Sequence, residues 1–183
     1  MILQAALELF TARGYDGCGV QEICEAAGIS KPTLYHYFGS KTGLLDALFA
    51  AHHPILAAEV AQAARYTRDL PADLERVMRA FFDFARQNPR YYRLLLGLSF
   101  APSQSEAHQR ALAWIQPQNQ ALVELFQQAE ADHGNMRGKS AYLAASFLGL
   151  IHSCIGLALN SSTRLDEALL YQALRHFQYG IYT

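Results

Sequence analysis

The stretch that decides the fold is residues 20–41, which reads VQEICEAAGISKPTLYHYFGSK. Apolar residues recur in it at steps of three and four, which predicts two short helices over about 20–27 and 31–37. Gly28 ends the first helix, and Ser30 is a suitable N-cap for the second because its hydroxyl accepts a backbone N–H of the first turn. Two short helices joined by the tetrapeptide AGIS predict a helix-turn-helix.

The second helix of this motif carries side chains suited to reading DNA. This helix offers hydroxyl groups, an imidazole and ring edges that can reach bases and phosphates. They belong to Thr33, Tyr35, His36 and Tyr37. Lys31 and Lys41 stand in the first turns of two successive helices, where outward-pointing backbone N–H groups also favour a phosphate. The alternative interpretation is that the tyrosines are half-buried packing residues and that Lys31 begins an ordinary capped helix.

Charge alone gives this interpretation little support. The whole chain has a formal net charge of −1, and its 51% hydrophobic residues indicate a packed core. Residues 1–52 hold three basic residues, Arg13, Lys31 and Lys41, against five acidic ones, Glu8, Asp16, Glu22, Glu25 and Asp46. Any attraction for phosphate must therefore come from a local arrangement of the three basic side chains.

The rest of the chain also shows helical spacing and no sustained strand pattern, which predicts an all-α fold. A first helix is expected at about 2–13 and a fourth from residue 41, which Pro54 either kinks or ends. Further helices are expected near 55–66, 71–87, 89–100, 105–132, 137–160 and 164–182. If Pro54 only kinks its helix, the total is nine, with a three-helix head at the N-terminus.

The helix expected at 137–160 is apolar nearly all round, so both of its sides need a cover. One side can pack on its own chain and the other on a second copy, which predicts a two-fold dimer through 137–160 and 164–182. The interface residues expected from this are Phe147, Ile151, Ile155, Leu159, Leu170, Leu174 and Phe177. Such a dimer places two reading helices about one DNA turn (~34 Å) apart, which predicts a pseudo-palindromic operator.

We expect two domains, a DNA-binding domain at residues 1–50 with its motif at about 19–38, and a ligand-binding and dimerisation domain at 51–183. The second domain is rich in aromatic residues that can line a cavity for a small apolar or aromatic effector. The candidate lining residues are Phe81, Phe84, Tyr91, Tyr92, Phe100, Trp114, Phe147 and His152. Core packing is the alternative explanation for most of them.

Several other classes of function are not supported by the sequence. Cofactor loops, catalytic motifs and a zinc-type spacing of Cys and His are absent from it, so we expect no enzyme, cofactor or metal. Its three cysteines favour a reducing cytosol and no disulfide, although Cys18 near a helix start is an alternative redox sensor. The start lacks the pattern of a secretory signal, and residues 141–159 are interrupted by polar residues, so a cytoplasmic protein is expected.

The N-terminal residues resemble the TetR family of bacterial regulators. The resemblance lies in LELFTARGY at 7–15, in residues 20–41 quoted above, and in Leu44-Leu45. It implies a dimer of nine or ten helices per subunit, in which the first three form the reading head and the fourth couples it to a ligand domain. Two departures are Cys18 and Gly19, where relatives often have Thr or Ser, and the start of the sequence inside the first helix, where relatives commonly carry a basic extension before that helix. Either the sequence is trimmed or the basic arm is absent.

The resemblance also assigns roles to residues. Those expected to contact the operator are Ser30, Lys31, Pro32, Thr33, Tyr35, His36 and Tyr37, with Lys41 on a phosphate. The expected mechanism is repression, in which an effector shifts the fourth helix and changes the distance between the two reading heads. The alternative is an architectural or adaptor protein of the same fold that binds DNA and has no small-molecule effector.

Overall fold

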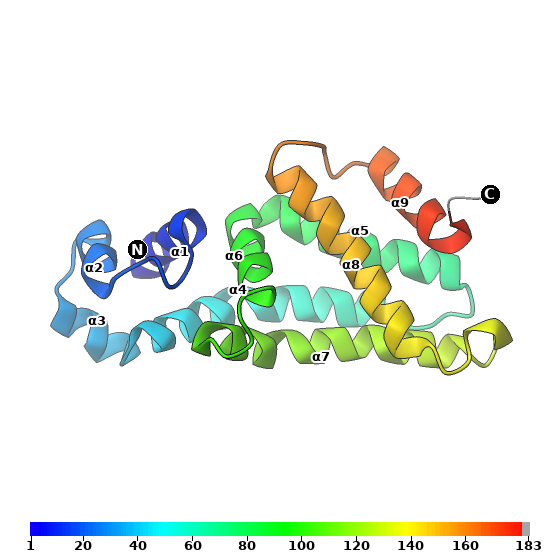
Figure 1. Ribbon diagram of the computed structural model, residues 1–183, viewed down its shortest axis with the longest axis horizontal. Coiled ribbons are helices and arrows are strands. Elements are labelled where there is room, and N and C mark those ends of the chain that lie inside the picture. Colours follow the sequence, from blue (N-terminus) through cyan, green and yellow to red (C-terminus); the bar gives the residue numbers. More distant parts are fainter. Residues whose placement is uncertain (181–183) are drawn as a thin grey trace. The chain divides into compact units, whose positions relative to one another are not determined.

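The computed structural model describes residues 1–180, and these form nine α-helices and one short 3-10 helix without any strand (Figure 1). The elements are α1 (Ile2–Arg13), α2 (Val20–Ala27), α3 (Lys31–Phe38), α4 (Lys41–Ala63), α5 (Leu70–Gln87), α6 (Pro89–Ser99), α7 (Glu106–Ala129), η1 (Gly134–Met136), α8 (Ser140–Leu159) and α9 (Glu167–Tyr179). The expected all-α, nine-helix architecture is thus confirmed.

The helix ends differ from expectation where a local feature stops the helix. Helix α4 continues through Pro54, so the proline does not end it. Helix α8 begins at Ser140 instead of residue 137, because Gly138 has a φ of 74° that a helix does not allow. Helix α9 begins at Glu167 because the carboxylate of Asp166 accepts the backbone N–H of Leu169 as an N-cap. The end expected at residue 182 lies outside the described residues.

The chain packs as two units, each discontinuous in sequence. The first unit contains residues 1–54 and 88–114, and the second contains residues 55–87 together with the chain from 115 onward. Helices α4 and α7 therefore each contribute to both units. Helix α6 packs against α1, so the expected N-terminal domain of residues 1–50 shares its packing unit with a segment that the linear division placed in the C-terminal domain.

The core of the first unit joins the N-terminal helices to α6 and the start of α7. The ring of Phe49 on α4 stacks on that of Trp114, with centroids 6.2 Å apart. Next to it, Nδ1 of the buried His53 lies 3.0 Å from the hydroxyl of Tyr91 on α6. Burial lowers the pKa of His53, so this ring is neutral at physiological pH and acts as a hydrogen-bonding core residue.

The core of the second unit is a cluster of phenylalanines. The rings of Phe126 on α7 and Phe147 on α8 meet edge to face, with centroids 6.4 Å apart. The ring of Phe177 on α9 lies 4.9 Å from that of Phe147. Helix α5 contacts both α8 and α9, so four helices share this core.

This packing corrects the expected dimer interface. Five of the seven expected residues are enclosed within their own chain: Phe147, Ile151, Ile155, Leu170 and Leu174. A side chain that its own chain already encloses has no surface left for a partner. Leu159 and Phe177 are half-buried, and Phe177 faces the phenylalanine cluster. The face of α8 that was expected to meet a partner is the face that packs into the core of its own chain.

The expected effector pocket also needs correction. Phe100 is 77% exposed, so it lines no enclosed cavity. The other candidates are divided between the units, with Tyr91, Tyr92 and Trp114 in the first and Phe81, Phe84, Phe147 and His152 in the second. Neither unit by itself brings all of these side chains together.

Candidate nucleic-acid interface

Local hydrogen bonds fix both helices of the motif at residues 19–38. The backbone N–H of Gly19 donates to Oε2 of Glu22 (2.8 Å), so an acidic side chain caps the start of α2. Helix α2 ends at Gly28, whose φ of 65° lies in the left-handed region that glycine adopts without strain. At α3, the backbone N–H of Thr33 donates to Oγ of Ser30 (3.3 Å), so the expected cap is present.

The side chains of α3 divide into an inner and an outer face. Leu34 is completely buried and Phe38 is half-buried, and both anchor the helix. The exposed residues are Ser30, Lys31, Pro32, Tyr35, His36 and Tyr37, while Thr33 is half-buried. Tyr37 is 68% exposed and its ring meets only that of His36 edge-on and that of Phe38 at a tilt. The packing interpretation therefore does not hold for Tyr37, whose ring faces solvent.

Lys41 begins α4 and is held by an aromatic ring. Its ammonium nitrogen lies 4.1 Å from the ring centroid of Tyr15 and 6.0 Å from that of Phe10. Oγ of Ser40 accepts the backbone N–H of Gly43 (2.9 Å) and so caps this helix. Two attractions for an anion, the ammonium group and the helix N-terminus, therefore coincide at the start of α4.

A second basic side chain in the head is already paired. Nη1 of Arg13 donates to Oε1 of Glu22, and the bond from Gly19 together with Arg13 lowers the pKa of the Glu22 carboxyl. Sequence reasoning missed this ion pair, because the two residues lie nine positions apart on different helices. Lys31 and Lys41 are thus the basic residues of 1–52 without an ion pair in the described structure.

Cys18 lies in the turn before α2, and the structure favours the simpler interpretation of this residue. Its Sγ donates to the backbone carbonyl of Leu9 (3.2 Å), and its side chain is buried. Burial raises the pKa of the thiol, which keeps it protonated and unreactive. The described residues contain no group of three or more His, Cys, Asp or Glu side chains arranged to hold a metal ion.

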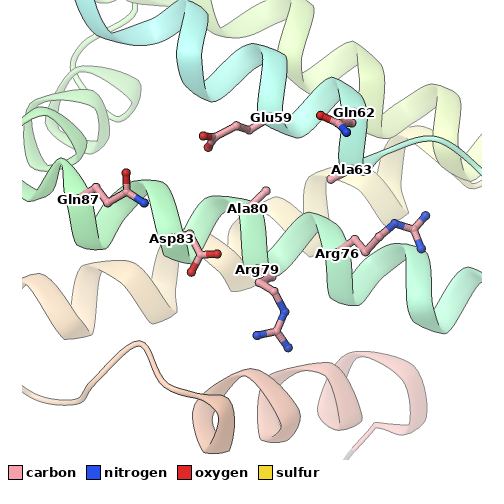
Figure 2. A pocket seen from close by; sticks show the side chains of 8 residues that line it. All are labelled: Glu59, Gln62, Ala63, Arg76, Arg79, Ala80, Asp83 and Gln87. Atoms are coloured by element: carbon pink, nitrogen blue, oxygen red, sulfur yellow. The ribbon is translucent and has the colours of Figure 1, made fainter.

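A groove of about 460 Å³ lies in the second unit between α4 and α5 (Figure 2). It is lined by Glu59, Gln62, Ala63, Arg76, Arg79, Ala80, Asp83 and Gln87, and none of these was a candidate from the sequence. The guanidinium of Arg79 points away from α4 and pairs with Glu75 and with Glu167 of α9. Arg76 pairs with the buried Asp73. Both arginines thus serve the packing of the unit.

Known proteins resemble both the head and the whole chain. The family model described as bacterial regulatory proteins of the tetR family matches residues 2–48, which are α1 to α3 and the start of α4. The transcriptional activator FasR of Mycolicibacterium smegmatis is 30% identical over 180 residues, covering 98% of this chain and 80% of FasR. The nucleoid occlusion factor SlmA of Pasteurella multocida is 30% identical over 118 residues, covering 64% of this chain and 53% of SlmA.

The whole architecture has a solved counterpart. The transcriptional regulator FadR of Bacillus subtilis, solved in complex with stearoyl-CoA, superposes with a TM-score of 0.79 at 20% identity, covering 99% of this chain and 98% of FadR. At that identity the likeness shows the fold alone. The sequence likeness to FasR extends over nearly the whole chain, and the family model falls on the reading head. The chain therefore belongs to the TetR family and is a DNA-binding transcriptional regulator.

Proposed function

We propose that this regulator binds a pseudo-palindromic operator as a two-fold dimer, represses transcription from it, and is released by an effector with a long apolar chain. The observation that carries this proposal is the outer face of α3, where Tyr35, His36 and Tyr37 are exposed on a helix anchored by Leu34. A helix held this way can enter the major groove and present its polar groups to base edges. Repression follows because a bound dimer occludes the promoter.

The residues divide into two roles in this proposal. Thr33, Tyr35, His36 and Tyr37 read base edges, while Ser30, Lys31, Pro32 and Lys41 fix the position of the head on the phosphates. Lys41 serves the second role because its ammonium group and the N-terminus of α4 act on the same anion. Cys18 and Gly19 supply no hydroxyl for a phosphate, so the reading head depends more on Lys31 and Lys41.

The proposed dimer surface is the outer face of α8 and α9. Along α8 the exposed residues are Ala141, Tyr142, Ala145, Gly149, Ser153 and Leu157, and on α9 Tyr171 and Tyr179 are exposed. Small residues spaced by four let a second helix approach closely, and the tyrosines and Leu157 supply apolar area to bury. Arg175 lies over the rings of both Tyr171 and Tyr179, which holds this end of α9 in one arrangement.

Helices α4 and α8 are long and apolar enough to cross a membrane by length and composition, which is weak evidence by itself. We propose that a second subunit covers the exposed apolar face of α8 in a cytoplasmic protein. Helix α4 contributes buried residues to the cores of both units, including Phe49 and Val60. A helix that supplies two protein cores in this way is accounted for without lipid.

The proposed effector site belongs to the second unit. Phe81, Phe84 and Phe147 are buried there, and His152 meets the ring of Phe81 edge-on. Burial lowers the pKa of His152 to about 4, so this polar group is uncharged at physiological pH and compatible with an apolar ligand. The stearoyl-CoA bound by FadR, which shares the fold, supports an acyl chain as the ligand. The likeness to SlmA instead supports an architectural protein without an effector.

Replacing Tyr37 with alanine is expected to abolish specific operator binding. Loss of one base-contacting side chain costs about 1–3 kcal/mol per half-site, and the dimer loses two. A mobility-shift titration against operator and scrambled DNA measures this loss. Phe100→Ala, which removes an equally exposed aromatic ring outside the motif, is the control and leaves binding unchanged. Unaltered sequence preference in Tyr37→Ala would refute the reading role of this helix.

Replacing Lys41 with alanine is expected to weaken binding to all DNA sequences alike. Each lost phosphate contact lowers the slope of log K against log salt by about one per subunit. Fluorescence anisotropy over a salt series measures the slope. Lys139, the remaining lysine of the chain beside Lys31 and Lys41, provides the matched Lys139→Ala control. If both variants give the wild-type slope, Lys41 makes no phosphate contact.

Replacing Gly149 with arginine is expected to separate the dimer into folded monomers. A Cβ at Gly149 meets no heavy atom within 4 Å, so the substitution is tolerated inside the chain and acts on the outer face of α8. Analytical ultracentrifugation measures the mass, and circular dichroism checks the fold. Gly134→Arg is the control, because its Cβ also meets open space and Gly134 lies outside α8 and α9. A Gly149→Arg variant that remains fully dimeric would exclude this surface.

Stearoyl-CoA is expected to release the regulator from its operator, whereas coenzyme A without the acyl chain is not. The acyl chain supplies the apolar area that the second unit can bury, at roughly 0.8 kcal/mol per CH₂ group. The measurement is a mobility shift at fixed protein and DNA with increasing ligand. Operator binding that no concentration of stearoyl-CoA alters would favour the architectural alternative.

A further inference from the structure

A second cleft, of about 410 Å³, lies within the first unit beside the reading head. One wall is the end of α1 and the turn that follows it, and the other wall is α6 and the segment after it. The residues that line the cleft include Phe10, Arg13, Tyr15, Arg93, Gly97 and Leu98. Its volume lies within the range of roughly 300–1,000 Å³ found for small-molecule sites.

The cleft combines an apolar floor with two guanidinium groups. Phe10, Tyr15 and Leu98 are buried and form apolar lining, whereas Arg13 and Arg93 come from opposite walls. Asp16 is the one carboxylate among the lining residues. A guanidinium has five N–H donors, so Arg13 retains donors while Nη1 bonds to Glu22, and its side chain is 57% exposed. Guanidinium groups pair with carboxylates in a bidentate manner.

Gly97 lines the cleft on the α6 side and has no side chain to occupy it. It lies inside a helix, where glycine costs about 1 kcal/mol relative to alanine. A Cβ built at Gly97 meets no heavy atom within 4 Å, so no neighbouring atom requires a glycine there. Because Gly97 is one of the lining residues, we expect a larger side chain at this position to occupy part of the cleft.

We propose that this cleft binds a small organic anion, with its carboxylate on Arg13 and Arg93 and its apolar body against Phe10 and Leu98. The site is separate from the effector site proposed in the second unit. Its chemistry resembles that of other small-ligand sites, which are mostly apolar with a few convergent polar groups.

Tyr15 connects this site to the reading head. Its ring lines the cleft, and the same ring carries the ammonium group of Lys41 at 4.1 Å. Its hydroxyl also lies 3.4 Å from Oγ1 of Thr42, the next residue of α4. A ligand that displaces the ring of Tyr15 therefore removes this contact of the Lys41 ammonium group. The consequence for operator binding rests on the proposed phosphate contact of Lys41.

The test uses octanoate as the anionic probe and octanamide as its uncharged match. Binding to the chain of residues 1–183 is followed by the amide resonances of Gly14, Gly17 and Gly97, which line the cleft. Octanoate is expected to shift these resonances with saturation and octanamide to bind about tenfold more weakly, because it forms no ion pair. Gly97→Leu, which fills the cleft, is expected to weaken octanoate binding at least about tenfold, as is Arg93→Gln.

Gly134→Leu is the matched control, because its Cβ also meets open space, and it keeps wild-type binding of octanoate. Unchanged glycine resonances in the wild type, equal binding of octanamide, or undiminished octanoate binding by Gly97→Leu would each overturn the proposal. Operator binding measured without octanoate tests the DNA-binding proposal separately from the proposed anion site. If Tyr37→Ala loses operator binding and Gly97→Leu keeps it, the DNA-binding proposal stands, whatever the result with octanoate.

Discussion

An eight-residue helix is too short to be stable in water by itself, and the function of this protein depends on α3, which is such a helix. Ser30 closes its first turn, Gly39 with a φ of 71° ends it, and the buried Leu34 anchors it. These three positions lie at the ends and on the inner face of the helix. The exposed residues on the outer face do not hold the helix in place, so the side chains of Tyr35 and Tyr37 are available to contact DNA.

The parts of the fold that sequence predicted are those that local interactions determine. Ser30 and Ser40 cap helices that begin one residue later, and Gly28 ends one, so the number and type of the helices could be predicted. Helix α8 could not be oriented in the same way, because apolar residues on every face give its periodicity no direction. Phe147 faces inward and Leu157 outward because of the phenylalanine cluster, which joins Phe147 to residues of two other helices, α7 and α9.

The candidate site shows the same difference between local and distant interactions. His36 follows Leu34 by two residues and so lies on the opposite face of α3, whereas Tyr37 is exposed although it lies only three residues after Leu34; sequence reasoning included both. The ring of Tyr15 under Lys41 and the pairing of Arg13 with Glu22 join residues from different helices, and no spacing rule brings them together. Both contacts change which positive charges are available. The head has more acidic than basic residues, so its net charge does not favour DNA. Its proposed attraction for phosphate therefore depends on the positions of Lys31 and Lys41.

The division into two units sets how each proposed ligand can act. The cleft beside α6 and the start of α4 lie in one packing unit, where the rings of Tyr15 and Phe10 both line the cleft and contact Lys41. The chain passes from one unit to the other three times. These crossings lie at Pro54 in α4, at Asn88 before Pro89, and at Trp114 three residues before Pro117 in α7. Pro54 and Pro117 lie inside α4 and α7, where a proline removes a backbone hydrogen bond and lets the helix bend, whereas Pro89 begins α6, where no such bond is lost. The effector proposed for the second unit would therefore act through α4 and α7, the two helices that continue from one unit into the other.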